Sequence, residues 1–122
     1  MLIDGEAGVE QINRRVMKTV DHLIMISDTS AKGVNVAYTI KHLAQDNKAV
    51  DYKSMGMILN RVRDESEVSN IKKNLPIQLL GWLPEDDLIR EFDFQGRSFL
   101  DFPDSAGACK TVKQIIQDLQ IL

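Results

Sequence analysis

The sequence predicts an α/β fold, with a parallel β-sheet of about four strands and helices on both faces. Short apolar runs alternate along the chain with segments whose apolar residues recur every three or four positions, which is the spacing of one helical face. A polar stretch follows each apolar run. Strands that alternate with helices of this length imply right-handed crossovers and therefore a parallel sheet.

Four apolar runs are predicted to be strands, because short continuous runs of this kind are typical of strands that are covered on both faces. They span residues 1–3, 22–27, 53–62 and 77–84. Helices are predicted between and after them. Their apolar stripes are Val9, Ile12, Val16 and Val20; Val36, Ile40, Leu43 and Ala44; Leu88, Ile89 and Phe92; and Val112, Ile115, Ile116 and Leu119. Asp64 and Glu67 have the spacing of a capping box for a further short helix through Ile71, and Gly96 is placed to end the helix that contains Phe92.

Length and composition indicate one globular domain over residues 1–122. The chain is 43% hydrophobic and 27% charged, with a net charge of −3 and no stripe of Lys and Arg interleaved with aromatics. We therefore expect no nucleic-acid partner. No apolar run approaches the roughly 20 residues that span a bilayer, so we expect a cytoplasmic protein without a membrane span. Cys109, His22 and His42 have no partner at metal-ligand spacing and are interpreted as structural or solvent-facing.

The polar strand ends are where a ligand is expected, because α/β sheets bind ligands beyond the carboxyl ends of their strands. These ends are residues 4–8, 27–30, 60–61 and 84–86. Asp4 suits a carboxylate that holds Mg²⁺ through water, and Gly8 suits a backbone N–H that approaches a phosphate. The alternative is that Asp4 and Gly8 only end a strand and begin a helix. Asn60 has an amide that suits a nucleobase edge, but it equally suits a turn, and Pro84 equally suits a plain strand terminator.

Together these stretches resemble a known family. The sequences DGEAGVEQINR, VDHLIMISDTSAKGVNVAYTIKHLA, ILNRV and LLGWLPEDDLIREFDFQGR are similar to the carboxyl-terminal half of the deviant-Walker P-loop ATPases related to MinD and the nitrogenase iron protein. Among them, the chain most resembles the ATPases that insert nickel into carbon monoxide dehydrogenase. The resemblance covers nearly the whole chain, and its most specific part is the Asp-x-x-Ala-Gly-x-Glu stretch that begins at Asp4.

The resemblance implies ATP or ADP and Mg²⁺ as ligands. It places Asp4 as the Walker B aspartate that supports Mg²⁺, and Ala7 and Gly8 in the switch that senses the γ-phosphate. It assigns contacts with adenine to Asn60, Arg61, Pro84, Glu85 and Asp86. It also implies a homodimer and a metalloenzyme client, although Gln11 stands where the nickel-insertion members carry histidine.

The family's phosphate-binding loop is missing from these residues. No G-x-x-x-x-G-K-[ST] motif occurs in the sequence. The resemblance therefore predicts that the chain is half of an ATPase domain and is inactive on its own. Without the strand that carries this loop, we expect either a homo-oligomer or a sheet in which residues 1–4 pair directly with residues 22–27.

Two other functional classes are considered. A phosphoacceptor receiver domain has about this length, but it requires an acidic pair after its first strand and a lysine after a later one, where this chain has Asp4 alone and Pro84. A non-catalytic interaction module derived from such an ATPase remains an alternative to nucleotide binding.

Overall fold

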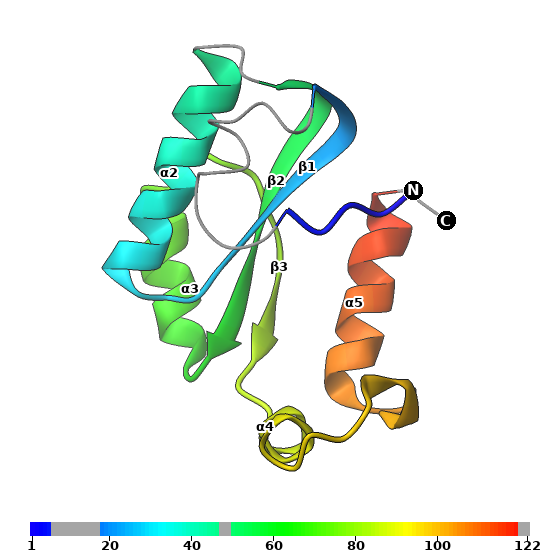
Figure 1. The fold of residues 1–122 in the computed structure, drawn as a ribbon. Coiled ribbons are helices and arrows are strands. Elements are labelled where there is room, and N and C mark those ends of the chain that lie inside the picture. Colours follow the sequence, from blue (N-terminus) through cyan, green and yellow to red (C-terminus); the bar gives the residue numbers. More distant parts are fainter. Residues whose placement is uncertain (6–17, 47–49, 120–122) are drawn as a thin grey trace.

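A computed structural model describes residues 1–5, 18–46 and 50–119 (Figure 1). Its elements are β1 (Thr19–Ser27), α2 (Ala31–Gln45), β2 (Asp51–Val62), α3 (Glu65–Lys72), β3 (Leu79–Pro84), α4 (Asp87–Phe94), a 3₁₀ helix η1 (Phe99–Asp101) and α5 (Gly107–Asp118). Strands and helices alternate through β3, as the sequence pattern predicts. None of the helices described is long and apolar enough to cross a membrane.

The three strands form a parallel sheet in the order β1-β2-β3. Figure 1 shows α2 and α3 on one side of this sheet and α5 on the other. The predicted α/β class is confirmed, with three strands in the described part of the chain where about four were expected. β1 lies at one edge of the sheet and is paired with β2 from Thr19 to Ser27. β3 pairs less regularly, with a shift in register after Met57.

The prediction of a strand at residues 1–3 is wrong. Residues 1–5 have no secondary structure, and both Met1 and Leu2 are fully exposed. The expected direct pairing of residues 1–4 with residues 22–27 is also absent: among the described residues, β1 pairs with β2 alone. An apolar run forms a stable strand where a neighbouring strand accepts its hydrogen bonds and a core covers its side chains, and among the described residues no strand pairs with this segment.

The first predicted helix lies mainly in residues 6–17, outside the described residues. Its last apolar position, Val20, is not helical but belongs to β1, which begins three residues earlier than predicted. Thr19 and Val20 pair with Asp51 and Tyr52, which extends the ladder at its amino end. Both Thr and Val favour strands, so local preference and pairing agree here.

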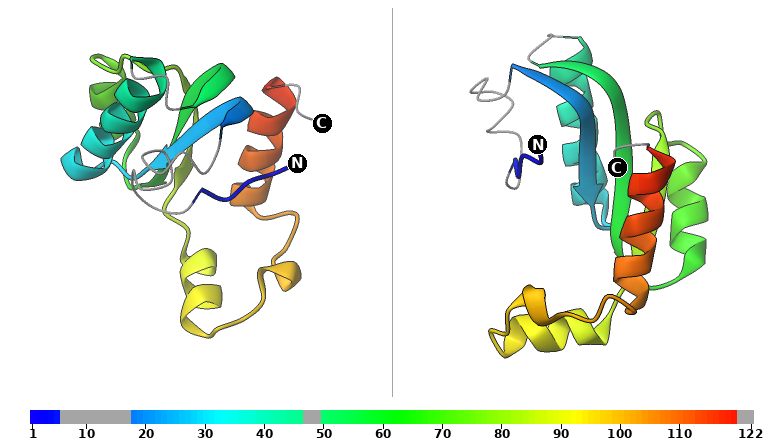
Figure 2. Two further views of the ribbon diagram at one scale, coloured as in Figure 1. Left: turned by 45° about the horizontal axis from the view of Figure 1, so that its top comes forward. Right: turned by 90° about the vertical axis from the view of Figure 1, so that its right-hand side faces the viewer.

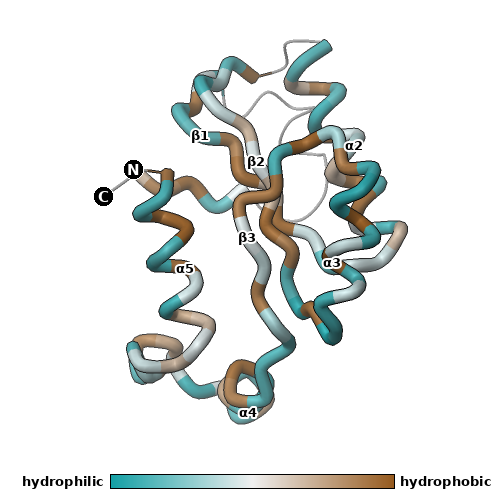
Figure 3. The backbone as a smooth tube through the Cα atoms, turned by 180° about the vertical axis from the view of Figure 1, so that it is seen from behind, coloured by the Kyte–Doolittle hydropathy of each residue, from teal (hydrophilic) through white to brown (hydrophobic). Residues whose placement is uncertain are grey.

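The larger core cluster lies between the sheet and the helices α2 and α3. Its buried residues are Met25, Ala37, Met57, Leu59, Val62, Val68 and Ile77. Figure 3 shows this apolar character concentrated along the strands. Met57 and Leu59 are two positions apart on β2, so both side chains lie on the same face of the strand. The helices α2 and α3 pack against this face.

On the opposite face of the sheet, α5 packs against β3. A Cβ atom on Gly81 would lie 2.7 Å from Ile115 Cδ1, so glycine allows α5 to approach the strand closely. Farther across this face, at the sheet edge, Ile26 of β1 remains 67% exposed. The helix α4, by contrast, begins directly after β3 and ends as predicted near Gly96, whose φ of 64° favours glycine.

Candidate functional site at the carboxyl ends of the strands

The loop after β1 folds around the carboxylate of Asp28. The Ser30 backbone N–H and hydroxyl both donate to Asp28 Oδ1, over 3.0 and 2.5 Å. Ser30 Oγ in turn accepts from the Gly33 N–H over 3.0 Å and caps α2. A Cβ atom on Gly33 would lie 2.5 Å from Asp28 Oδ1, so a side chain at this position would displace the Asp28 carboxylate.

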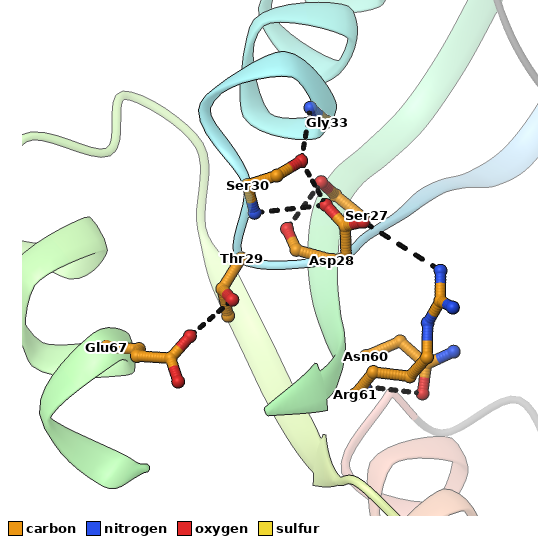
Figure 4. A network of polar contacts seen from close by, with 8 residues as sticks. All are labelled: Ser27, Asp28, Thr29, Ser30, Gly33, Asn60, Arg61 and Glu67. Carbon is orange, nitrogen blue, oxygen red and sulfur yellow. Dashed lines mark hydrogen bonds and ion pairs between the residues drawn. The ribbon is translucent and has the colours of Figure 1, made fainter. Parts of the chain in front are cut away.

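The end of β2 contributes a cation to this loop. Arg61 has a φ of 53°, which is uncommon for a residue with a side chain, and its guanidinium lies 3.8 Å from Asp28 Oδ2. The Arg61 N–H donates to Asn60 Oδ1 over 3.0 Å. Figure 4 shows Arg61 reaching toward Asp28 while Asn60 stays beside its own backbone. The Arg61 side chain therefore contacts the loop after β1, whereas the Asn60 side chain contacts the backbone at the end of β2.

The helix α3 joins the same loop through Glu67. The Thr29 hydroxyl donates to the Glu67 carboxylate across 38 positions of sequence (Figure 4). Asp64 caps α3 as predicted, accepting from the Ser66 N–H over 2.9 Å. Glu67, however, does not complete the capping box, because its carboxylate contacts Thr29 instead. Glu67, which the sequence predicts as part of a capping box, instead connects α3 to the loop after β1.

These elements border an open polar cavity of about 330 Å³. It is lined by Asp28, Thr29, Ser30, Arg61, Arg63, Glu67 and Glu85. Three carboxylates and two guanidinium groups therefore face one space. Glu85 Oε2 lies 3.6 Å from Arg63 Nε, and Glu85 Oε1 accepts from Arg90 over 2.6 Å. Such a lining offers both donors and acceptors to a ligand that carries hydroxyl or amide groups.

Of the site residues expected from the sequence, only Arg61 and Glu85 line this cavity. Pro84 ends β3 opposite Val62, and Asp86 caps α4 by accepting from the Leu88 N–H over 2.9 Å. Other expected residues lie apart from the cavity or outside the described chain. Asp4 lies in the exposed coil of residues 1–5, which Figure 1 places away from the carboxyl ends of β2 and β3, and Gly8 lies outside the described residues.

Sequence reasoning identified the stretch 27–30 as a polar strand end but assigned it no role. Asp28, Thr29 and Ser30 nevertheless supply much of the cavity lining. The signal was their position after the apolar run of β1, directly before a helix. Arg63 and Glu67 carried no such signal, because their contribution depends on how α3 packs against the sheet.

The pKa of the Asp28 carboxyl is lowered below its usual value. The main cause is the hydrogen bond from the Ser30 hydroxyl, followed by the Ser30 N–H and the nearby Arg61 charge. A lowered pKa means that the ionised carboxylate stabilises the folded chain. This contribution is complete above the unfolded-state pKa of 3.8 and is lost as the pH falls through the folded-state value.

We therefore expect Asp28→Asn to reduce the free energy of unfolding at neutral pH, with the difference from wild type shrinking from about pH 5 downward. The effect should be modest because the Asp28 side chain is 38% exposed. Urea unfolding of both proteins at neutral and acidic pH measures it. Asp51→Asn, at an exposed position, serves as the control, and a difference that is the same at every pH would contradict the prediction.

No protein-family model matches the chain. Among curated proteins, an uncharacterized ATP-binding protein of Methanocaldococcus jannaschii is 34% identical over 98% of this chain and 47% of its own length. A second uncharacterized ATP-binding protein of that organism is 31% identical over 80% of this chain. The carbon monoxide dehydrogenase accessory protein CooC of Rhodospirillum rubrum is 30% identical over 83% of this chain and 38% of its own.

The fold is also found among solved structures. The cell division protein MinD of Aquifex aeolicus superposes with a TM-score of 0.64 and 18% identity, over 84% of this chain and 45% of MinD. MinD in the MinC:MinD complex of the same organism gives the same TM-score. This chain thus spans about half the length of the proteins that it matches. It is a homologue of the ATP-binding proteins related to CooC, and it has the fold of the MinD-like P-loop ATPases.

Proposed function

We propose that this chain supplies the adenine and ribose side of an ATP site. The observation that carries the proposal is the polar cavity at the carboxyl ends of three parallel strands, in a chain whose relatives are named ATP-binding proteins. Parallel α/β sheets place their ligands at this edge.

The chemistry of the cavity favours a hydroxyl-bearing group over a phosphate. Asp28, Glu67 and Glu85 would repel a phosphate, and the guanidinium of Arg61 lies beside Asp28 while that of Arg63 lies beside Glu85. Carboxylates accept hydrogen bonds from ribose hydroxyls readily. This cavity therefore suits the sugar of a nucleotide.

Asn60 is the proposed contact with the base. Its Oδ1 is already bonded to the Arg61 N–H, which leaves the amide NH₂ as a donor to a ring nitrogen of adenine. Pro84, Glu85 and Asp86 are proposed to form the loop along the base. The Glu85 N–H donates to the Val62 carbonyl over 2.9 Å, so this loop is held against the end of β2.

The residues that the structure describes contain no group of three or more His, Cys, Asp or Glu side chains that could hold a metal ion. Asp4 as the Mg²⁺-supporting carboxylate and Gly8 as a γ-phosphate contact remain proposals that rest on the resemblance.

The client, the oligomeric state and the cellular location are proposed by analogy with related proteins. CooC is named an accessory protein of carbon monoxide dehydrogenase, so we propose a metalloenzyme client. A part in nickel insertion, a homodimer and a cytoplasmic location are proposed from the resemblance of the sequence to the nickel-insertion ATPases. A non-catalytic interaction module is the second candidate, and the observation that favours it is the lack of a G-x-x-x-x-G-K-[ST] motif in the sequence.

Thermal unfolding with ATP and with adenosine tests the proposal. A ligand at a hundred times its Kd stabilises a protein by about 2.7 kcal/mol, so saturating ligand should raise the melting temperature. We expect adenosine and ATP to give similar shifts, because the proposed contacts are with base and sugar. Asn60→Ala and Arg61→Ala should remove most of the shift, whereas Asn70→Ala, an exposed position on α3, should not.

No shift at millimolar ATP or adenosine would reject nucleotide binding and favour the interaction module. A shift with inorganic triphosphate as large as that with ATP would instead show that the chain recognises phosphate, which contradicts the assignment of the cavity to ribose.

A further inference from the structure

The segment 85–104 extends beyond the carboxyl ends of the strands. Figures 1 and 2 show α4 and η1 projecting away from the sheet in every view. Large apolar side chains are exposed on it: Phe94 is 92% exposed, Leu100 is 96% exposed and Phe99 is 53% exposed. We call these three side chains, with the acidic residues around them in sequence, the α4–η1 surface. Large apolar side chains exposed on one projecting segment are typical of an interaction site.

An aromatic cluster holds this surface together. Phe92 is buried, and its ring centroid lies 6.0 Å from that of Phe99 and 5.2 Å from that of Phe102. The Arg97 guanidinium lies 4.1 Å from the centroid of the Phe92 ring. Phe99 is therefore packed against Phe92, and this aromatic cluster joins α4 to η1.

The same segment carries an excess of negative charge. Residues 85–104 hold seven of the eighteen acidic residues of the chain and two of its fifteen basic residues. Both cations are engaged, Arg90 with Glu85 and Arg97 with the Phe92 ring. Six carboxylates form no ion pair with the residues that the structure describes: Asp86, which caps α4, and Asp87, Glu91, Asp93, Asp101 and Asp104.

We propose that the α4–η1 surface binds a basic amphipathic segment of another protein, with apolar side chains against Phe94, Phe99 and Leu100 and with Lys or Arg against the carboxylates. Complementary charge selects this partner. A second copy would oppose acidic side chains to acidic side chains, and nucleic acid or an anionic membrane would be repelled. Because none of the three apolar residues lines the polar cavity, this inference is independent of the proposed nucleotide site.

A labelled model peptide, with leucines on one helical face and lysines on the other, is the probe, and fluorescence anisotropy measures its Kd. Burying one large apolar side chain is worth about tenfold in affinity or more, so Phe94→Ser/Leu100→Ser should raise the Kd at least tenfold. Glu91→Gln/Asp93→Asn should raise it about threefold to tenfold and weaken its dependence on salt.

Matched variants elsewhere on the chain control for general effects. Val112→Ser removes a partly exposed apolar side chain on α5, and Asp51→Asn/Glu65→Gln removes two exposed charges. Both should bind the peptide as wild type does. A peptide with Glu in place of Lys should not bind, and Phe94→Ser/Leu100→Ser should keep the melting temperature of wild type because both side chains are exposed.

Equal affinity of the Lys peptide for wild type and for Phe94→Ser/Leu100→Ser would overturn the proposal. So would sedimentation that finds a wild-type dimer and a Phe94→Ser/Leu100→Ser monomer, since a second copy would then cover the surface.

Discussion

Purified chain mixed with Mg·ATP is expected to release phosphate at the background rate. Phosphoryl transfer depends on positioning and on stabilising the charge that develops on the phosphate oxygens. In P-loop enzymes a backbone cradle, its lysine and a loop Ser or Thr on Mg²⁺ supply much of that stabilisation. These 122 residues contain no G-x-x-x-x-G-K-[ST] motif. Losing one preorganised donor typically costs about 10² to 10³ in rate, so lacking the whole cradle should leave no measurable turnover.

The control for this experiment is a comparison with Asp4→Ala and Asn60→Ala, purified in the same way. If a trace contaminant hydrolyses ATP, all three preparations release phosphate equally. If instead the unmodified chain turns over as an ordinary ATPase does and Asp4→Ala abolishes the activity, the prediction is wrong. The chain would then contain a phosphate-binding loop that its sequence pattern does not reveal.

Replacing Leu59 by Ala is expected to reduce the free energy of unfolding by about 2 to 5 kcal/mol. Leu59 is fully buried on the face of β2 that packs against α2 and α3, and it directly precedes Asn60. The loss combines the transfer free energy of the removed atoms with the cost of the cavity left among neighbours such as Met57 and Val68. For a domain of this size the melting temperature should fall by roughly 8 to 20 °C.

Ile26→Ala is the matched control, because Ile26 lies at the end of the neighbouring strand and is 67% exposed. Its effect should stay within about 0.5 kcal/mol, as is usual for surface substitutions. Urea or thermal unfolding followed by circular dichroism measures both variants. Equal destabilisation by the two substitutions would mean that the cluster around Leu59 is not the centre of the core.

Much of the fold could be predicted from local pattern. The runs at 22–27, 53–62 and 77–84 became β1, β2 and β3, with bounds shifted by up to three residues. Asp64 capped α3, and Gly96 adopted the positive φ that ends α4. These features follow from residues close in sequence, whose local preferences agree with the tertiary structure here.

The site was less predictable, because a strand end does not reveal which side chains converge there. Asn60 and Arg61 are neighbours, yet only Arg61 reaches the cavity. Glu67 reads as half of a capping box, but packing of α3 places it against Thr29. Asp86 reads as a ligand contact and is used as a helix cap. Each of these side chains has chemistry that suits both a local structural role and a role in the site. The role that it takes depends on which residues pack next to it in the folded chain.

The sequence by itself determined the alternation of strands and helices, the parallel class and the relationship to ATP-binding proteins, because these are written in periodicity and in contiguous motifs. Only the tertiary structure decided that residues 1–3 form no strand and that Asp28, Arg61 and Glu67 meet at one edge. The physical reason is that strand pairing and side-chain convergence depend on contacts between segments distant along the chain. An apolar run favours burial, but it forms a buried strand only when another strand pairs with it.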